Sequence, residues 1–203
     1  VMAASFCIDL PRESRRRLLG IARQSIHFGL EERRALTVTP PESSDPLAAV
    51  HGVFVTLTQR ASLRGCIGSL EGVLPLAQAV ADAAYSAAFR DPRFPAMAAG
   101  ECTWTRIEIS VLSGMEPILA NNRAHLLETV VPGQDGLVLE DGYHRSTFLP
   151  KVWEQLPEPE AFLGQLLLKA GLPPDHWSSS IKLMRYTTLS FADEDGAVCR
   201  EKH

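Results

Sequence analysis

Long apolar runs are missing from this sequence, and so is an excess of basic residues. No apolar stretch approaches the roughly 20 residues that a membrane-spanning helix needs, so no membrane association is expected. The 203 residues contain 20 Lys and Arg against 24 Asp and Glu, which gives a formal net charge of −4 at pH 7. Non-specific nucleic-acid binding depends on neutralising phosphates with Lys and Arg. A nucleic-acid partner is therefore not expected either.

Cysteine is scarce and widely spaced. The four cysteines are Cys7, Cys66, Cys102 and Cys199, with no Cys-x-x-Cys pair and no Cys/His pattern at zinc spacing. No cysteine triplet is present that would hold an iron–sulfur cluster. A Gly-x-Gly-x-x-Gly or P-loop signature is also missing. These absences predict that the chain itself binds no metal or cofactor, and they favour free thiols in a reducing cytoplasm.

The distribution of apolar residues predicts one N-terminal helix and then alternating strands and helices. Leu18, Ala22 and Ile26 recur at helical spacing within residues 11–30. The neighbouring run Arg15–Arg17 is interpreted as the solvated face of that helix. Strands are expected at 52–59, 63–68, 103–112, 136–140, 143–148 and 181–191. Further helices are expected at 74–90 and, with an interruption near 157–159, over 150–170.

The order strand, strand, helix, strand occurs twice, which predicts an internal ββαβ duplication. The two halves lie at roughly 51–113 and 136–191. Turn signals such as Asp141-Gly142 indicate hairpins, so the sheets are expected to be largely antiparallel and the class α+β. The length suits one domain over residues 1–203 with its core at 11–191.

The hexapeptide Leu63-Arg64-Gly65-Cys66-Ile67-Gly68 is the best candidate site in the chain, because it combines a cation, a thiol and glycines. If it is extended, Arg64 and Cys66 lie on the same face, and a nearby cation favours thiolate over thiol. Gly65 and Gly68 would then let a substrate backbone or a phosphate come close. Cys66 and Arg64 are accordingly the candidate catalytic residues. The alternative is a buried thiol that only packs, with the glycines marking a bulge.

The pairing of this segment with the preceding strand decides what lies beside the thiol. A tight hairpin after Gln59 would place Val55 opposite Cys66, and a slip of one residue would reverse every side chain. The residues predicted to share this face are Val53, Val55, Arg64 and Cys66. His51 would fall on the Cys66 side and is the one nearby histidine for the base that a nucleophile needs.

Charged residues outside the hexapeptide have two interpretations each. Glu108 and Arg106 lie on the polar side of an otherwise apolar strand, where they would form a carboxylate–guanidinium site near Arg64 or a solvated face. Arg93 follows a helix stop at Asp91, and it would hold a phosphate or carboxylate bidentately or serve the turn. The candidate binding residues are therefore Arg93, Glu108, Gly65, Gly68 and His51.

Six further segments accompany the hexapeptide in order along the chain. They are Phe54-Val55-Thr56-Leu57, Asp91-Pro92-Arg93-Phe94, Glu108-Ile109-Ser110-Val111-Leu112-Ser113, Gly136-Leu137, Thr147-Phe148-Leu149-Pro150 and Lys169-Ala170-Gly171-Leu172. Together with Leu63–Gly68, they resemble the signature of the AMMECR domain family, whose bacterial and archaeal members are called AmmeMemoRadiSam system protein A. The resemblance covers nearly the whole chain, from about residue 11 to residue 191.

The resemblance implies an α+β fold of two unequal, intimately packed lobes. It also implies which proteins the chain works with, but it implies no reaction mechanism. The prokaryotic members are named for association with a Memo-like protein and a radical S-adenosylmethionine protein. The first hypothesis is therefore a cytoplasmic component, accessory or catalytic, of such a modification system, with S-adenosylmethionine and an iron–sulfur cluster bound only by the partner. The second is a non-catalytic binding or adaptor module for a protein or a small anion. The third is a stand-alone thiol enzyme acting through Cys66.

Overall fold

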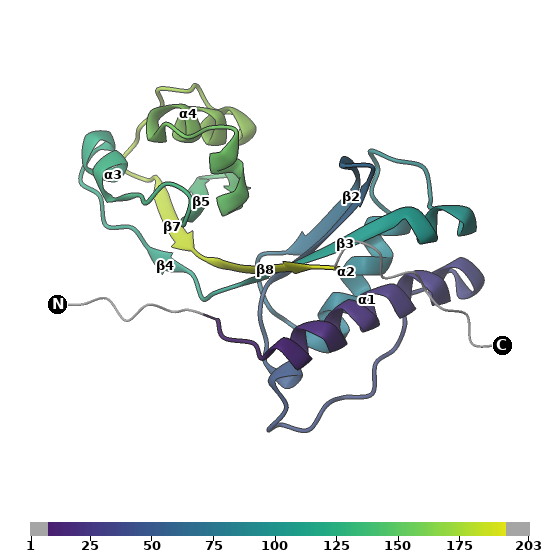
Figure 1. Ribbon diagram of the computed structural model, residues 1–203. Helices are drawn as coiled ribbons and strands as arrows, with labels where there is room; N and C mark the ends of the chain where they lie inside the picture. Colours follow the sequence, from purple (N-terminus) through teal and green to yellow (C-terminus); the bar gives the residue numbers. More distant parts are fainter. Residues whose placement is uncertain (1–7, 194–203) are drawn as a thin grey trace. The chain divides into compact units, whose positions relative to one another are not determined.

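The structure, a computed structural model, describes residues 8–193, and its contacts divide the chain into two compact units of unequal size. Within the described part, the larger unit comprises residues 8–112 with 189–193, and the smaller comprises residues 113–188. Each unit holds one four-stranded sheet (Figure 1). The strand orders are β2-β1-β3-β8 in the larger unit and β4-β7-β5-β6 in the smaller. Helices combined with antiparallel strand pairs confirm the α+β class.

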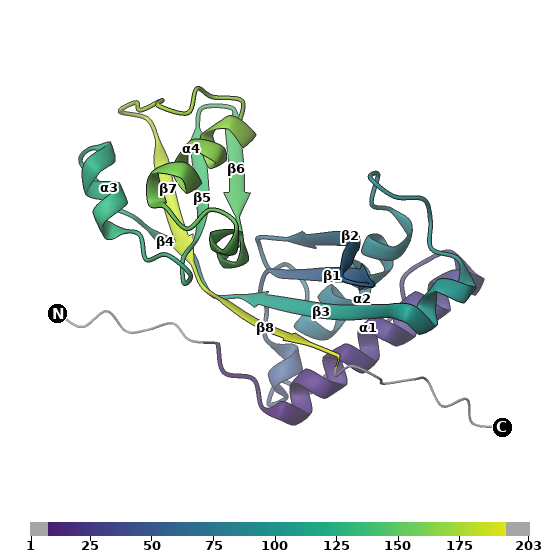
Figure 2. The same ribbon diagram turned by 45° about the horizontal axis from the view of Figure 1, so that its top comes forward.

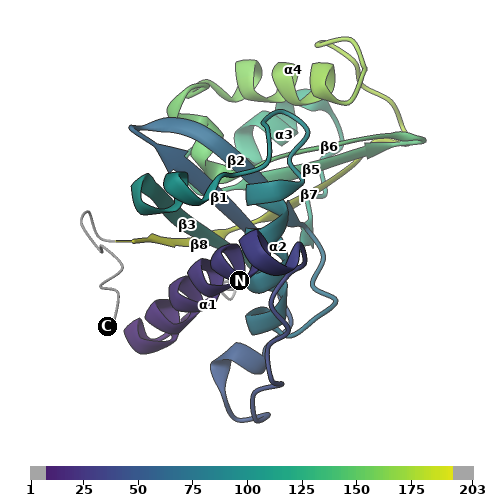
Figure 3. The same ribbon diagram turned by 90° about the vertical axis from the view of Figure 1, so that its right-hand side faces the viewer.

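In the larger unit, two helices cover one face of the sheet (Figure 3). The elements are α1 (Arg12–Glu32), β1 (Val53–Gln59), β2 (Ser62–Ser69), α2 (Leu76–Phe89), β3 (Thr105–Leu112) and β8 (Thr188–Ala192). Short 3₁₀ helices occur at Pro46–Ala48 and Ala99–Trp104. Helix α2 packs against both α1 and the β1–β2 hairpin, which explains its many buried alanines: small side chains allow close approach on two sides.

In the smaller unit, the core forms where helix α4 packs against strand β6 (Figure 2). The elements are β4 (Glu116–Pro117), α3 (Arg123–Thr129), β5 (Gly136–Asp141), β6 (His144–Phe148), a 3₁₀ helix at Pro150–Glu154, α4 (Pro159–Lys169) and β7 (Lys182–Tyr186). Trp153 stacks on Phe162 with ring centroids 3.8 Å apart. Helix α3 was not predicted from the sequence; the Asn122 side chain caps it by accepting from the His125 N–H.

The predicted ββαβ duplication is present in the strand order of both sheets. In each, the first strand of a hairpin lies between its hairpin partner and the strand that follows the helix: β2-β1-β3 and β6-β5-β7. The fourth strand is exchanged, since β4 follows β3 in the chain but pairs with β7, while β8 follows β7 but pairs with β3.

The exchange corrects the prediction of one strand over 181–191. The chain forms β7 and β8 instead, and it passes from one sheet to the other at Thr187. Ser113 holds this crossing point: its N–H donates to the Thr187 carbonyl at 2.9 Å, and its hydroxyl accepts from the Thr187 N–H at 2.9 Å. Tyr186, before the crossing point, is buried, and Leu189, after it, packs against the core of the larger unit, so one run of sequence contributes to two cores.

The structure bears on the cysteines and on membrane-spanning helices only over the residues that it describes. Cys66 and Cys102 are free thiols, whereas Cys7 and Cys199, like the tail beyond Asp193, lie outside the described residues. Over residues 8–193, no helix has both the length and the apolar character needed to cross a membrane.

Candidate functional site

The β1–β2 hairpin places the hexapeptide on an edge strand with one extra residue. Arg60 and Ala61 both have positive φ, 49° and 64°, as a two-residue type I′ turn requires. Pairing continues to Thr58↔Leu63 and then resumes at Leu57↔Gly65. Arg64 is therefore the additional residue of a β-bulge, which shifts all later pairs by one.

The bulge makes the predicted register around the thiol wrong. Cys66 lies opposite Thr56 rather than Val55, and Ile67 takes the place opposite Val55. Because side chains alternate along a strand, Ile67 faces the helices with Val55, and Cys66 faces away from them with Thr56. Cys66 is half-buried there, and its Sγ accepts a hydrogen bond from Thr56 Oγ1 at 3.3 Å.

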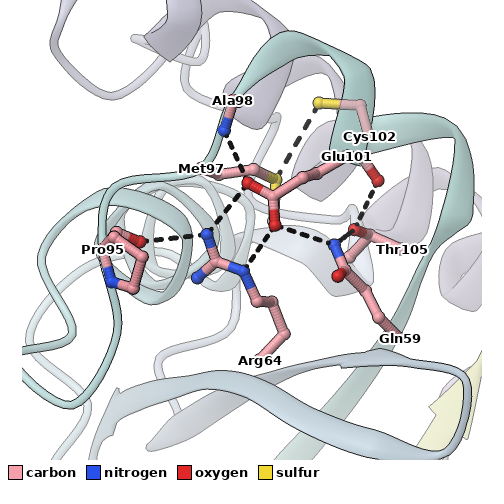
Figure 4. Close-up of polar contacts among 8 residues, drawn as sticks. All are labelled: Gln59, Arg64, Pro95, Met97, Ala98, Glu101, Cys102 and Thr105. Carbon is pink, nitrogen blue, oxygen red and sulfur yellow. Dashed lines mark hydrogen bonds and ion pairs between the residues drawn. The ribbon is translucent and has the colours of Figure 1, made fainter.

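Arg64 is bound to Glu101 (Figure 4). Its Nε donates to Glu101 Oε1 at 2.7 Å, and its Nη2 donates to Glu101 Oε2 at 3.1 Å and to the Pro95 carbonyl at 2.9 Å. The side chains of Arg64 and Glu101 are 9% and 31% exposed, so the pair is largely withdrawn from water. The Arg64 guanidinium, with the Ala98 N–H and Gln59, lowers the pKa of Glu101 to about 2.

Asp91 and Arg93 hold the outer edge of strand β2 at Cys66. Asp91 Oδ2 accepts from the Cys66 N–H at 2.9 Å, and Arg93 Nη2 donates to the Cys66 carbonyl at 3.1 Å. The two side chains also bind each other through two guanidinium hydrogen bonds of 2.9 and 2.6 Å. Arg93 keeps the pKa of Asp91 well below its usual range. They thereby satisfy edge-strand groups that would otherwise be open to another strand.

Glu108 reaches the same sheet face as Cys66, two strands away. Thr56 pairs with Cys66 on one side and with Glu108 on the other, so a thiol, a hydroxyl and a carboxylate form one row across β2, β1 and β3. Strands are spaced by about 4.8 Å, which puts the row's ends roughly 10 Å apart. Arg106, one step further along β3 on this face, is exposed.

His51 does not join this row. It lines a hollow of about 260 Å³ that also includes Val53, Ile67 and Ala79, on the face that packs against α2. We call this the α2 hollow; its remaining border includes Gly68, Glu71, Val73, Leu74 and Asp82. Val73 is 81% exposed and Leu74 42%. The register shift explains the misplacement, since it moved Cys66 to the opposite face.

The two glycines of the hexapeptide are required by the protein's own packing. A Cβ on Gly65 would lie 2.1 Å from the Ala87 carbonyl oxygen of helix α2, and one on Gly68 would lie 2.1 Å from the Val53 carbonyl oxygen. Both distances are far below van der Waals contact. The glycines therefore allow the helix and the neighbouring strand to approach.

Sequence reasoning missed a second polar cluster, in the smaller unit. Asp141 accepts from Ser180 Oγ at 2.6 Å and from His176 Nε2 and Ser178 Oγ, both at 2.7 Å. These hydrogen bonds, that of Ser180 foremost, lower the pKa of Asp141 to about 2. The hydroxyls are bound to the carboxylate and not to the imidazole, so this is not the order of an acyl-transfer triad. The cluster ties the loop over residues 176–180 to the β5–β6 turn.

Comparison with protein-family models and with other proteins shows which family the chain belongs to. A family model described as AMMECR1 matches residues 19–191. The chain belongs to the AMMECR1 family.

AMMECR1-family relatives match over most of their length. A Methanothermobacter thermautotrophicus protein is 38% identical over 189 residues, covering 92% of this chain and 97% of its own. Protein MJ0810 of Methanocaldococcus jannaschii is 40% identical over 144 residues, covering 69% and 72% respectively. The crystal structure of the uncharacterized protein PH0010 from Pyrococcus horikoshii superposes with a TM-score of 0.79 at 33% identity, covering 88% of this chain and 90% of that one. These names state no activity, so membership in the AMMECR1 family supplies lineage and fold without a reaction.

Proposed function

We propose that this AMMECR1-family chain is a partner-binding component of a modification system. In this system a separate radical S-adenosylmethionine protein initiates the chemistry and a Memo-like protein takes part. The proposal of these two partners rests on the resemblance to AmmeMemoRadiSam system protein A. The geometry bears on a separate question, which is whether the chain binds a partner or carries out catalysis, and it supports binding.

The contacts of the hexapeptide favour binding over nucleophilic catalysis. A thiol nucleophile needs a base within hydrogen-bond reach, and the group that reaches Cys66 Sγ is the Thr56 hydroxyl, which donates to it. Arg64 is held by Glu101, and the main chain at Cys66 is held by Asp91 and Arg93. The polar groups of the motif are thus used to build this part of the protein.

The observation that carries the proposal is the α2 hollow on the other side of the same strand. Val53, Ile67 and Ala79 line it, and the exposed Val73 and Leu74 stand at its border. Apolar side chains grouped around a hollow mark interaction sites on protein surfaces. Glu71 and Asp82 also line it, so the expected occupant is an apolar side chain of a partner protein that lies next to a basic residue.

Partner capture tests this surface directly. Tagged chain is mixed with the purified radical S-adenosylmethionine protein and the Memo-like protein from the same source, and the affinity for each is measured by titration. Val73→Lys places a positive charge at the border of the hollow, where it would repel the basic residue of the partner, and it is expected to weaken binding of one partner by at least about tenfold. Leu119→Lys is the matched control, because Leu119 is 84% exposed and lies in the smaller unit.

Two outcomes would count against the proposal. If neither partner bound the wild-type chain, the proposed partners would be wrong. If Val73→Lys and the wild type bound with equal affinity, the α2 hollow would not be the binding surface. Thermal unfolding of both variants should match the wild type, because both side chains are already exposed to water.

A further inference from the structure

The α2 hollow opens onto the backbone of an edge strand. Strand β2 lies at the end of its sheet (Figure 2). Gly68 and its two neighbours in β2 line the hollow, together with Ala79, Asp82 and Ala83 of helix α2. Because glycine carries no side chain, the part of Gly68 that lines the hollow is its main chain.

The main-chain groups of Gly68 point away from the sheet. The N–H and the carbonyl of Cys66 are bound by Asp91 and Arg93, outside the sheet. In an antiparallel ladder, alternate residues direct both main-chain groups toward one neighbouring strand or away from it. Pairing with β1 is regular from Gly65 to Ser69. Gly68, two residues after Cys66, therefore directs its N–H and its carbonyl outward as well.

Unlike those of Cys66, the outward groups of Gly68 are open. Within residues 8–193, no hydrogen bond joins the Gly68 N–H or carbonyl to a group outside β1. Gly68 is half-buried, and what it exposes is main chain. Open main-chain groups on an edge strand are a template for pairing with another chain. The edge of this sheet is thus closed to a further strand at Cys66 and open to one at Gly68.

We propose that the partner of the α2 hollow binds as an added strand, in which an extended segment of the partner pairs antiparallel with β2 at Gly68. The proposal rests on the α2 hollow being the partner-binding surface, and it specifies how the partner is held. One residue of the partner exchanges both main-chain hydrogen bonds with Gly68, in the arrangement that β1 already has with its two neighbours. Strand addition of this kind takes its affinity from the main chain and its specificity from alternate side chains.

The pleat of the added strand determines which of its side chains are read. The residue opposite Gly68 points to the same face as Gly68, and the residues on either side of it point toward helix α2, as Ile67 does. One of these two is apolar, because Ile67 and Ala79 line the hollow. The other is basic: Asp82 accepts from the Gln78 amide at 2.8 Å, and since that donor is neutral, Asp82 keeps its negative charge. The recognised sequence is therefore an apolar and a basic residue separated by one position.

The test is an NMR titration of the full chain with two acetylated and amidated peptides, Thr-Leu-Thr-Lys-Thr and Thr-Lys-Thr-Leu-Thr. At least one is expected to bind saturably, and the tighter one is used further. At saturation, hydrogen exchange of the Gly68 amide should slow by at least about tenfold, because this amide becomes hydrogen-bonded. The Cys66 amide is the internal control. It is already bound to Asp91, so its exchange should stay within about twofold.

The main-chain hydrogen bonds are tested in the peptide rather than in the protein. A substitution at Gly68 is not usable, because its Cβ would lie 2.1 Å from the Val53 carbonyl oxygen. N-methylation of the central threonine removes the donor to the Gly68 carbonyl and should weaken binding about tenfold. N-methylation of the next residue blocks an amide that points away from β2. That peptide should bind within about twofold of the parent and is the matched control.

A charge variant tests the basic position. Asp82→Asn should weaken binding of the lysine peptide about threefold and leave a peptide with glutamine in place of lysine unchanged. Glu31→Gln removes an exposed carboxylate at the end of α1 that does not line the hollow. It should change neither affinity.

Three results would overturn strand addition: no saturation by either peptide, unchanged exchange of the Gly68 amide on binding, or equal affinities of the two N-methylated peptides. If one of these occurred while Val73→Lys still weakened binding of a partner protein, the proposed function would stand without the added strand. Peptide binding that protects Gly68, together with no binding of either partner protein, would keep the added strand and remove the proposed partners.

Discussion

Replacing Arg64 by alanine is expected to lower the free energy of unfolding by about 3 kcal/mol. The variant removes the bidentate partner of Glu101 and the donor to the Pro95 carbonyl from a largely buried position. Removing one member of a buried ion pair costs more than the pair contributes, because the other charge stays behind without compensation. The expected loss lies at the low end of the range for breaking a buried ion pair. The reason is that Glu101 still accepts a hydrogen bond from the Ala98 N–H and is 31% exposed. Urea unfolding measures it.

The pH dependence of this difference identifies its cause. The carboxyl pKa of Glu101 is lowered from 4.5 to about 2 in the folded protein, with Arg64 as the main cause. The stabilisation is therefore fully present above about pH 4.5 and is lost as the pH falls through about 2. The difference in unfolding free energy between the wild type and Arg64→Ala should narrow over this pH range.

Arg106→Ala, which removes an exposed arginine of β3, should change stability by less than about 0.5 kcal/mol. A similar small loss for Arg64→Ala would contradict the structural role.

Gly65→Ala is expected to destabilise the protein by about 3 kcal/mol, although it adds one methyl group. The added Cβ would lie 2.1 Å from the Ala87 carbonyl oxygen and 3.0 Å from its carbon. Both are backbone atoms of helix α2, so relief requires the helix to move away from the sheet. Chemical unfolding of the full chain measures the loss.

The same substitution at Gly20 provides a control of opposite sign. Gly20 lies within helix α1 and a Cβ there meets nothing within 4 Å. Gly20→Ala should therefore stabilise the protein by about 0.5–1 kcal/mol through helix propensity alone. If Gly65→Ala were equally harmless, the close approach of α2 to strand β2 would not depend on this glycine.

The fold was largely predictable because its elements carry strong local signals. Helix α1 follows the spacing of Leu18, Ala22 and Ile26, and the second hairpin forms as predicted, although its turn is at Gly142-Tyr143, one residue later than the predicted Asp141-Gly142. The exchange of β4 and β8 was not predictable, since the sequence between Ile181 and Phe191 contains no Gly, Pro, Asn or Asp that would indicate a turn near Thr187. Which sheet a strand joins depends on contacts far away in sequence.

The site was predictable as a segment but not in its detail. One bulge residue, Arg64, moved Cys66 to the other face, and alternation alone could not reveal it. The partners of Arg64 and Cys66, namely Glu101 and Asp91, lie 37 and 25 residues away. Asp91 stood in a recognisable motif, whereas Glu101 lies in a 3₁₀ turn without a distinctive pattern. Contacts between residues so far apart in the chain produce no periodic pattern in the sequence.

The central claim is that the hexapeptide builds a binding surface and does not supply a nucleophile. The most direct test is Cys66→Ser, studied in a system reconstituted with the radical S-adenosylmethionine and Memo-like proteins. We expect the variant to keep wild-type stability, partner affinity and product formation to within about twofold. Loss of product formation by Cys66→Ser, at unchanged stability and unchanged partner affinity, would contradict it and assign the thiol a catalytic role.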